Sequence, residues 1–206
     1  MRDTQLNAAE IKVGVVGLGL MGCSITTCLL MAGHPVVAVA PLPVDLKFAL
    51  KRITKHLQRS RREKLIKNLP EFYLQHLNIT EDYHRLQGCS LVIECTLENI
   101  DIKKSVYGKI ESVIGEDALL ASNTSAIPIS LLQQQTAHPS RFFGLHWAEP
   151  SHTTRFLEVI CGNNSDLQKG EQLYELSHLW GKEPTLVRKD IRGFITNRIM
   201  YAMYRE

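Results

Sequence analysis

The sequence lacks any long apolar run, and this absence limits where the protein can reside. No uninterrupted stretch is long enough to span a bilayer, and residues 1–7 lack the apolar core that a signal peptide needs. Internal repeats and low-complexity segments are missing as well. The five cysteines are odd in number and show no metal-ligand spacing, which is typical of small core residues in a reducing compartment. We therefore expect a cytoplasmic protein with no metal site and no membrane partner.

A strong excess of one charge is also missing. The net charge of +3 over 206 residues is too small to indicate nucleic-acid binding. The hydrophobic fraction of 44% and the charged fraction of 22% are ordinary for a globular protein. The chain is long enough for one domain with a full core and a fragment of a second domain.

A glycine-rich turn follows the first predicted strand. Residues 11–16 form a β-branched run, and Gly-Leu-Gly-Leu-Met-Gly at 17–22 leads into an apolar helical stretch at 24–31 and a second strand at 36–40. Between strand and helix, such glycines let the backbone approach a pyrophosphate, which lies on the positive end of the helix. The alternative is a glycine turn without a ligand. The pattern predicts dinucleotide binding at Gly17, Gly19, Leu20, Met21 and Gly22.

One part of such a site is missing. The second strand normally ends in Asp or Glu, which holds the adenosine ribose, but Ala40 stands here and Pro41 follows. No arginine is present at this point to bind a 2′-phosphate, and Asp45 or a backbone group would have to replace the acid. We expect the cofactor NAD.

The remaining segments alternate between strand and helix patterns. Residues 46–76 predict two basic amphipathic helices joined near Ser60, which form either a solvated face or an anion-attracting surface. Strands are expected at 77–79, 89–95, 118–121 and 184–187, and helices at 102–114, 166–180 and from 194 onward. The predicted fold class is α/β, with a Rossmann-type doubly wound, mostly parallel sheet and a helical-pair insertion after the second strand.

Polar side chains follow two of these strands. Glu94, Glu98 and Asn99 end or follow the strand at 89–95, and Ser-Asn-Thr-Ser at 122–125 follows the strand at 118–121. Ligands of open parallel sheets bind beyond the carboxyl ends of the strands, so these residues lie where a nicotinamide would reach. Ser125 has a second interpretation, as a helix cap.

A histidine and a glutamate occupy two apolar runs that are separated by a polar turn. Residues 142–158 predict a hairpin-like pair of strands broken at 149–154, with His146 in the first strand and Glu158 in the second. Pairing of the strands can bring the imidazole and the carboxylate together as a proton-transfer device. The alternative is a core histidine and an unrelated surface glutamate.

Taken together, these motifs resemble the 3-hydroxyacyl-CoA dehydrogenase family over nearly the whole chain. Beyond the glycine turn, the matching segments are Val-Ile-Glu-Cys-Thr-Leu-Glu-Asn at 92–99, Ala-Ser-Asn-Thr-Ser at 121–125, Gly-Leu-His at 144–146, Phe-Leu-Glu-Val at 156–159 and Gly-Phe-Ile-Thr-Asn-Arg at 193–198. Several ordered motifs are far more specific than any one of them.

The resemblance implies an oxidoreductase that moves a hydride between the 3-hydroxyl carbon of a 3-hydroxyacyl-CoA and NAD. His146 would be the general acid/base and Glu158 its orienting partner. Ser125 and Asn197 would bind the reacting oxygen and the base, and Glu98, Lys103 and Asn123 would line the nicotinamide side of the cleft. The family also implies an acyl-CoA partner, a role in fatty acid metabolism and a homodimer in a full-length form.

Two departures from the family pattern keep other functions open. The usual Phe-Asn-Pro after the histidine is Ala148-Glu149-Pro150, and Glu149 would select a free or cationic hydroxy acid. Relatives that act on sugar acids or carnitine share the histidine and glutamate arrangement, so such substrates stay open. Family members continue into a helical domain, so we expect 1–188 to form the dinucleotide-binding domain and 189–206 a linker and the first helix of a truncated second domain. A non-catalytic dinucleotide-binding module is the remaining alternative.

Overall fold

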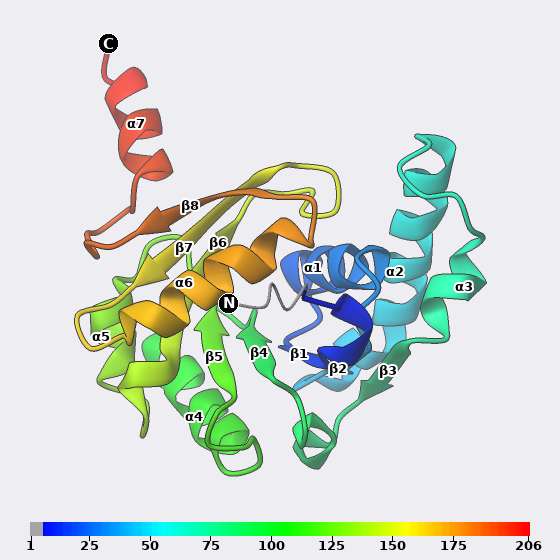
Figure 1. Ribbon diagram of the computed structural model, residues 1–206, viewed down its shortest axis with the longest axis horizontal. Helices are drawn as coiled ribbons and strands as arrows, with labels where there is room; N and C mark the ends of the chain where they lie inside the picture. The colour runs from blue at the N-terminus through cyan, green and yellow to red at the C-terminus, as the bar shows by residue number, and fades with distance from the viewer. Residues whose placement is uncertain (1–5) are drawn as a thin grey trace.

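The computed structural model describes residues 6–206, so the first five residues of the expected dinucleotide-binding domain lie outside the described residues. Its centre is an eight-stranded sheet with the order β3-β2-β1-β4-β5-β6-β7-β8 (Figure 1). The strands are β1 (Val13–Val16), β2 (Val36–Val39), β3 (Leu77–Thr80), β4 (Leu91–Glu94), β5 (Leu119–Ser122), β6 (Phe142–Trp147), β7 (Phe156–Cys161) and β8 (Glu183–Val187).

Only one pairing in this sheet is antiparallel, that of β6 with β7. The first six strands in the sheet order are parallel to one another, and β7 and β8 form a second parallel pair. Strands β1, β2 and β4 are buried along their full length, because helices cover both faces, as is usual for parallel sheets. The predicted Rossmann-type, mostly parallel fold is confirmed.

Helices cover the two faces of the sheet around two separate hydrophobic clusters. On one face, α1, α2 and α6 pack over a cluster that includes Ile25, Ile53 and Leu173. On the other face, α4 and α5 contribute Tyr107 and Leu132. The helices are α1 (Leu20–Met31), α2 (Pro43–Arg62), α3 (Pro70–Leu74), α4 (Ile100–Glu111), α5 (Ile129–Gln133), α6 (Leu167–His178) and α7 (Thr196–Met203), with short 3-10 turns η1 (Ala8–Glu10), η2 (Tyr83–Leu86) and η3 (Pro139–Arg141).

The inserted helical pair differs from its prediction in the position of the junction. Helix α2 continues past Ser60, whose side chain is buried, and ends at Arg62. Lys64 then adopts a φ of 61°, a left-handed conformation that stops the helix. The sequence did not predict the end of α2 at Arg62, because lysine and arginine occur on both sides of it and both favour a helix.

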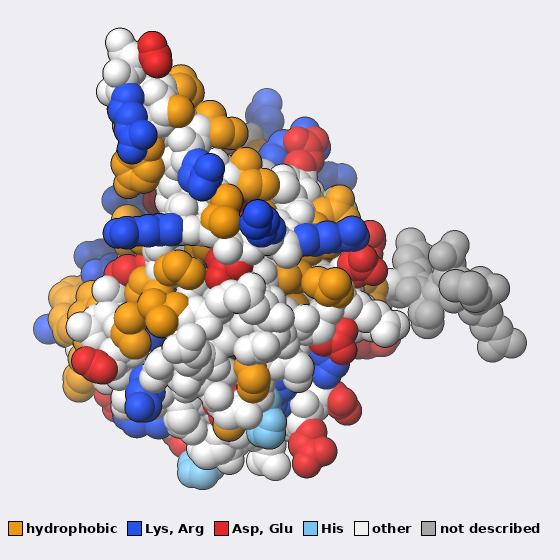
Figure 2. Space-filling view, turned by 90° about the vertical axis from the view of Figure 1, so that its left-hand side faces the viewer, with side chains coloured by type: hydrophobic (Ala, Val, Ile, Leu, Met, Phe, Trp, Pro, Cys, Tyr) orange, Lys and Arg blue, Asp and Glu red, His pale blue; other side chains and the backbone are white. Residues whose placement is uncertain are grey.

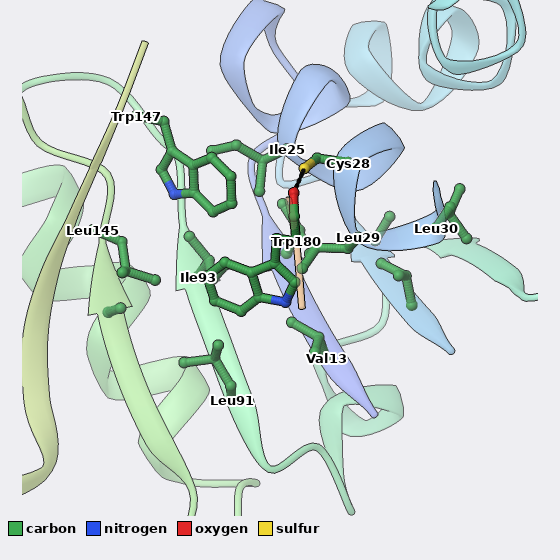
Figure 3. Packing of buried hydrophobic residues seen from close by; sticks show 14 of the residues in the cluster. Val13, Ile25, Cys28, Leu29, Leu30, Leu91, Ile93, Leu145, Trp147 and Trp180 are labelled. Carbon is green, nitrogen blue, oxygen red and sulfur yellow. Dashed lines mark hydrogen bonds between the residues drawn. The ribbon is translucent and has the colours of Figure 1, made fainter. Parts of the chain in front are cut away.

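The core on the first face contains two tryptophans from distant segments. Trp147 ends β6, Trp180 follows α6, and their rings stack with centroids 5.3 Å apart and an interplanar angle of 24°. Figure 3 shows both rings beside Ile25 and Cys28 of α1. The end of β6 is therefore packed directly against the helix that begins at the glycine turn.

Helix α7 projects away from the sheet at the end of the chain (Figure 1). None of its residues is buried, and apolar and basic side chains lie along its surface (Figure 2). Its large exposed side chains are Ile199, Met200, Tyr201 and Met203.

Candidate active site

The carboxyl ends of the central strands bring the predicted site segments to one edge of the sheet. Glu94 at the end of β4 is in register with Val16 of β1 and with Ser122 of β5. The backbone beyond these strands remains in register, because Cys95 donates to the carbonyl of Val16 at 2.7 Å and Asn123 donates to the carbonyl of Glu94 at 2.8 Å. The glycine turn, the 95–99 segment and the 122–125 segment therefore meet at this edge.

The glycines at 17, 19 and 22 are required for different reasons. Gly17 has a φ of +98° and lies against the backbone of Cys95, and a Cβ on Gly22 would overlap the carbonyl oxygen of Gly17. Gly19 is different, because nothing lies within 4 Å of the place where its Cβ would stand. Gly19 is also the N-cap of α1, with no side-chain cap and no acidic residue in the first turn. The free amides and the open space fit a pyrophosphate.

His146 and Glu158 meet across the antiparallel pair. They are directly opposite in the register of β6 and β7, and His146 Nδ1 lies 2.7 Å from Glu158 Oε2. Both side chains are buried, with exposed fractions of 7% and 1% for the two residues. A carboxylate only accepts hydrogen bonds, so Nδ1 carries the proton and Nε2 of the neutral ring is the free base. The alternative of an unrelated surface glutamate is wrong.

The second oxygen of Glu158 binds the chain that leads into α7. Glu158 Oε1 accepts the backbone N–H groups of Ile195 at 2.9 Å and Thr196 at 3.0 Å. Burial alone would raise the pKa of Glu158, but the hydrogen bonds from His146 and from these two amides lower it below its ordinary value. The carboxylate is therefore ionised at neutral pH and holds the histidine in one tautomer.

Two aromatic rings fix the imidazole from the sides. Phe156 contacts it edge-on with centroids 5.6 Å apart, and Phe194 is tilted against it at 5.5 Å. Phe194 is fully buried although its φ is 50°, a conformation that non-glycine residues seldom adopt. Gly193 before it has a φ of 81°. The Gly-Phe pair thus makes the sharp turn that brings the start of α7 to Glu158.

Ser125 and Asn197 are also brought together. The side-chain amide of Asn197 donates to the carbonyl of Ser125 at 2.7 Å. Ser125 is exposed and does not cap a helix, because α5 begins later, at Ile129 after Pro128. The helix-cap interpretation of Ser125 is wrong.

The segment that ends in Ser125 is held by Glu98. One oxygen of this carboxylate accepts the hydroxyl of Thr124, the amide of Ser125 at 3.1 Å and the amide of Ala126 at 3.3 Å. The other oxygen lies 3.4 Å from the ammonium of Lys103. The Glu98 side chain is 40% exposed, so it can still meet a ligand in the cleft. Asn123 is half-buried, and its side-chain oxygen accepts the amide of Trp147 at 3.5 Å.

Two of the polar residues at this sheet edge are buried beneath it, and a third caps a helix. Glu94 is fully buried, as is Lys103, whose ammonium lies beneath the cleft surface rather than on it. The side chain of Asn99 caps α4 by accepting the amide of Ile102 at 3.1 Å. The interpretation that Glu94 lies where a nicotinamide would reach is therefore wrong, because its side chain is buried in the core. Asn99 is exposed beside its helix, and its place near a nicotinamide stays a prediction.

A buried network surrounds Glu94. Its carboxylate accepts hydrogen bonds from Lys103, from the hydroxyl of Ser122 at 2.7 Å, from Tyr107 at 3.1 Å and from both the amide and the hydroxyl of Thr96 at 2.6 Å. Burial raises the pKa of Tyr107 well above its ordinary value, and the charge of Glu94 adds to the rise. The sequence pattern missed this network because the lysine lies nine residues from its partner, on the next helix.

The strand end that would hold the adenosine ribose lacks the acidic residue of the common dinucleotide-binding pattern. Ala40 follows β2 and is buried, so no carboxylate is present at that strand end. Asp45 in the first turn of α2 lies 3.5 Å from the guanidinium of Arg52, which donates to the carbonyl of Leu18 in the glycine turn at 3.1 Å. Asp45 is therefore linked to the glycine turn indirectly, through the guanidinium of Arg52.

Glu149 is exposed on the loop between β6 and β7. Burial raises the pKa of the Cys23 thiol to about 11, and the charges of Asp45 and Glu149 add to the rise. Two residues after Glu149, the amide of Ser151 donates to Ser24 of α1 at 2.8 Å, so this part of the loop lies against that helix.

No group of three or more His, Cys, Asp or Glu suited to a metal ion occurs within residues 6–206. No helix in this part of the chain has the length and hydropathy of a membrane span.

The doubly wound sheet and the glycine turn on α1 define a dinucleotide-binding domain of the Rossmann type. The family model described as "3-hydroxyacyl-CoA dehydrogenase, NAD binding domain" matches residues 12–191. The chain belongs to the 3-hydroxyacyl-CoA dehydrogenase family, an NAD-dependent family of oxidoreductases, and the predicted resemblance is confirmed.

Individual relatives include enzymes of two kinds. The chain is 35% identical over 198 residues to 5-formyl-3-hydroxy-2-methylpyridine 4-carboxylate 5-dehydrogenase of Mesorhizobium japonicum, covering 95% of this chain and 63% of that protein. It is 31% identical over 196 residues to a probable 3-hydroxybutyryl-CoA dehydrogenase of Deinococcus radiodurans, covering 95% of this chain and 70% of that protein. The crystal structure of (S)-3-hydroxybutyryl-CoA dehydrogenase from Ralstonia eutropha matches with a TM-score of 0.88 and 30% identity, over 93% of this chain and 68% of that one.

Proposed function

We propose that this chain supplies the cofactor site and the acid/base residues of an NAD-dependent dehydrogenase that acts on a 3-hydroxyacyl-CoA. The observation that carries the proposal is the buried 2.7 Å contact between His146 and Glu158. It lies at the same sheet edge as the glycine turn. Bound NAD would supply the hydride acceptor.

The protein groups would manage the proton and the position of the substrate. His146 would take the proton of the 3-hydroxyl at Nε2, and Glu158 would stabilise the imidazolium that forms. Ser125 and Asn197 would hold the reacting oxygen, because their backbone and side chain already contact each other at 2.7 Å. Glu98 would bind on the nicotinamide side of the cleft, with Asn123 beside it and Lys103 holding Glu98 from below. The basic side chains of α2 favour a substrate that carries phosphates, such as a coenzyme A thioester, because positive charges attract phosphates.

A second candidate is a dehydrogenase of a free hydroxy acid or a related small carboxylate. Glu149 favours a cationic hydroxy acid of the carnitine type within this class, since an exposed carboxylate attracts a cation and repels the phosphates of coenzyme A. The relative from Mesorhizobium japonicum, named for a pyridine carboxylate, supports the same alternative. The third candidate is a dinucleotide-binding module without catalysis.

The domain division is part of this proposal. Residues 1–188 would form the dinucleotide-binding domain, and residues 189–206 a linker and the first helix of a helical domain that closes the substrate cleft and forms a homodimer. The exposed apolar side chains of α7 support this division.

One assay separates the three candidates. NADH oxidation by the full-length protein is followed with acetoacetyl-CoA and, in parallel, with a panel of free oxo acids, for the wild type and for His146→Ala. NADH affinity is measured separately by fluorescence. Turnover of acetoacetyl-CoA that is lost in His146→Ala supports the main proposal. Turnover of the free acids alone supports the second candidate, and NADH binding without turnover leaves the non-catalytic module.

A further inference from the structure

The loop 148–155 that joins β6 to β7 is held by side chains from other elements. It connects the strand of His146 to the strand of Glu158, and it is irregular, yet Ser151 and His152 are buried with exposed fractions of 0% and 6%. Buried loop backbone requires hydrogen-bond partners. Here the partners come from α1 and from the turn before β8.

Ser24 of α1 makes the most direct connection. Its hydroxyl oxygen accepts the amide of Ser151 at 2.8 Å and lies 3.1 Å from Nδ1 of His152. A hydroxyl has one proton, and donating it to Nδ1 satisfies both groups only if His152 is neutral. If His152 were protonated, Nδ1–H would donate to the second lone pair of the Ser24 oxygen, and the serine proton would lose its acceptor at Nδ1. Protonation therefore reverses this hydrogen bond and leaves the serine proton without its partner.

Two further residues close around the loop. The ring of His56 in α2 stacks on His152 with centroids 4.6 Å apart and an interplanar angle of 18°. The buried ammonium of Lys182 donates to the carbonyls of Ser151 and Thr154. It also lies 5.1 Å from the ring centroid of Trp147, the residue after His146.

Three of the four charged groups near His152 oppose its protonation: His56 and Arg59 of α2, and Lys182 in the turn before β8. The carboxylate of Glu63, directly after α2, acts in the opposite direction. On the loop itself, Glu149 acts on His56. Burial, followed by the effects of His56 and Arg59, lowers the pKa of His152 to about 4. When Nδ1 accepts the serine proton, Nε2 carries the ring proton and is buried without a hydrogen-bond partner, so a second proton would have to add at Nδ1, against Ser24.

We propose that Ser24 and His152 form a latch between helix α1 and the loop that joins His146 to Glu158, and that both are positioning residues. The first turn of α1 is the part of the protein that would bind the pyrophosphate, and Ser24 lies one turn further on. Cofactor binding that orders α1 therefore also orders the loop, and protonation of His152 weakens the latch. The link to catalysis rests on the proposed function, whereas the latch itself is independent of any substrate.

Hydrogen exchange of the full-length protein, read by mass spectrometry, tests the latch without a substrate. In Ser24→Ala and His152→Phe, the amides of 151–154 should exchange at least tenfold faster than in the wild type, while the central strands stay protected. Thr26→Val is the matched control, because Thr26 is a buried hydroxyl on the same helix that has no hydrogen-bond partner. It should leave the loop unchanged. Wild-type exchange in both variants, or equal acceleration in the control, would overturn the latch.

Two further measurements separate the latch from the proposed function. In the wild type, loop protection, corrected for intrinsic exchange, should fall as pH drops from 6.5 to 4, and His152→Phe should show no such step. Added NAD should slow loop exchange in the wild type but not in Ser24→Ala. If NAD binds and slows the loop equally in both, the coupling through Ser24 is refuted. If NAD does not bind at all, the proposed function fails, and the substrate-free exchange still decides the latch.

Discussion

The ammonium of Lys103 lies 2.9 Å from each carboxylate oxygen of Glu94, and neither side chain is exposed to solvent. This pair lies directly beneath Glu98 and the segment that ends in Ser125. Lys103 also reaches Glu98 at 3.4 Å, so a buried charge pair anchors a carboxylate that faces the cleft.

Removing one member of the pair should be far more damaging than removing both charges. Lys103→Met leaves Glu94 as an unpaired buried anion, and we expect the free energy of unfolding to fall by about 3–5 kcal/mol. Urea denaturation measures it. The double variant Glu94→Gln with Lys103→Met has no buried charge and should recover at least half of the loss. A single variant as stable as the wild type would contradict this account.

Replacement by alanine should impair cofactor binding at one glycine of the turn and folding at another. Gly19→Ala should fold normally, since the added Cβ meets no atom within 4 Å. It should weaken NAD binding at least about tenfold, because the methyl group occupies the space of the pyrophosphate. Gly22→Ala should lower the stability of the fold by about 2 kcal/mol or more, because its Cβ overlaps the carbonyl of Gly17. Thermal unfolding and calorimetric NAD titration together distinguish a binding defect from a folding defect.

Glu158 predicts a defect in turnover without a defect in cofactor binding. In Glu158→Gln the uncharged amide no longer stabilises an imidazolium at His146, so kcat should fall about a hundredfold or more. The dissociation constant of NADH should change less than about threefold. Glu171→Gln is the control, because Glu171 is an exposed glutamate paired with Arg188 far from the cleft. Unchanged kcat in Glu158→Gln would remove the carboxylate from the mechanism.

His152 predicts how stability depends on pH. Its pKa is about 4 in the folded protein, against about 6.5 for an unperturbed histidine. The unfolded chain therefore takes up a proton first as pH falls, and this stabilises the unfolded state. The resulting loss of stability begins near pH 6.5 and levels off near pH 4, with an upper limit of about 3 kcal/mol. Melting temperatures of the wild type and His152→Phe across this range should converge as the pH falls. Parallel curves would show that other groups set the acid sensitivity.

The sequence was most informative where a periodic pattern coincided with a motif. The glycine turn was predictable between its strand and its helix, because close backbone contacts such as that of Gly17 with Cys95 require glycine there. The pairing of His146 with Glu158 was predictable because two apolar runs of equal character flank a short polar loop. The succession of strands and helices along the chain was predictable because strand-like and helix-like patterns alternate in the sequence.

Other features depend on contacts that no local pattern records. Lys103 looks like an exposed residue at the start of a helix, and only the packing of α4 on the sheet buries it against Glu94. Ser24 and His152 are 128 residues apart, and neither belongs to a recognisable motif. The cap that Asn99 forms on α4 was not predicted, because the same side chain suits a ligand site and a helix cap.

The two oxygens of Glu158 serve different parts of the chain, one the imidazole and the other the entry to the terminal helix. Thr196 is the first residue of α7, so a single buried carboxylate fixes both the imidazole ring and the direction in which the terminal helix leaves the sheet.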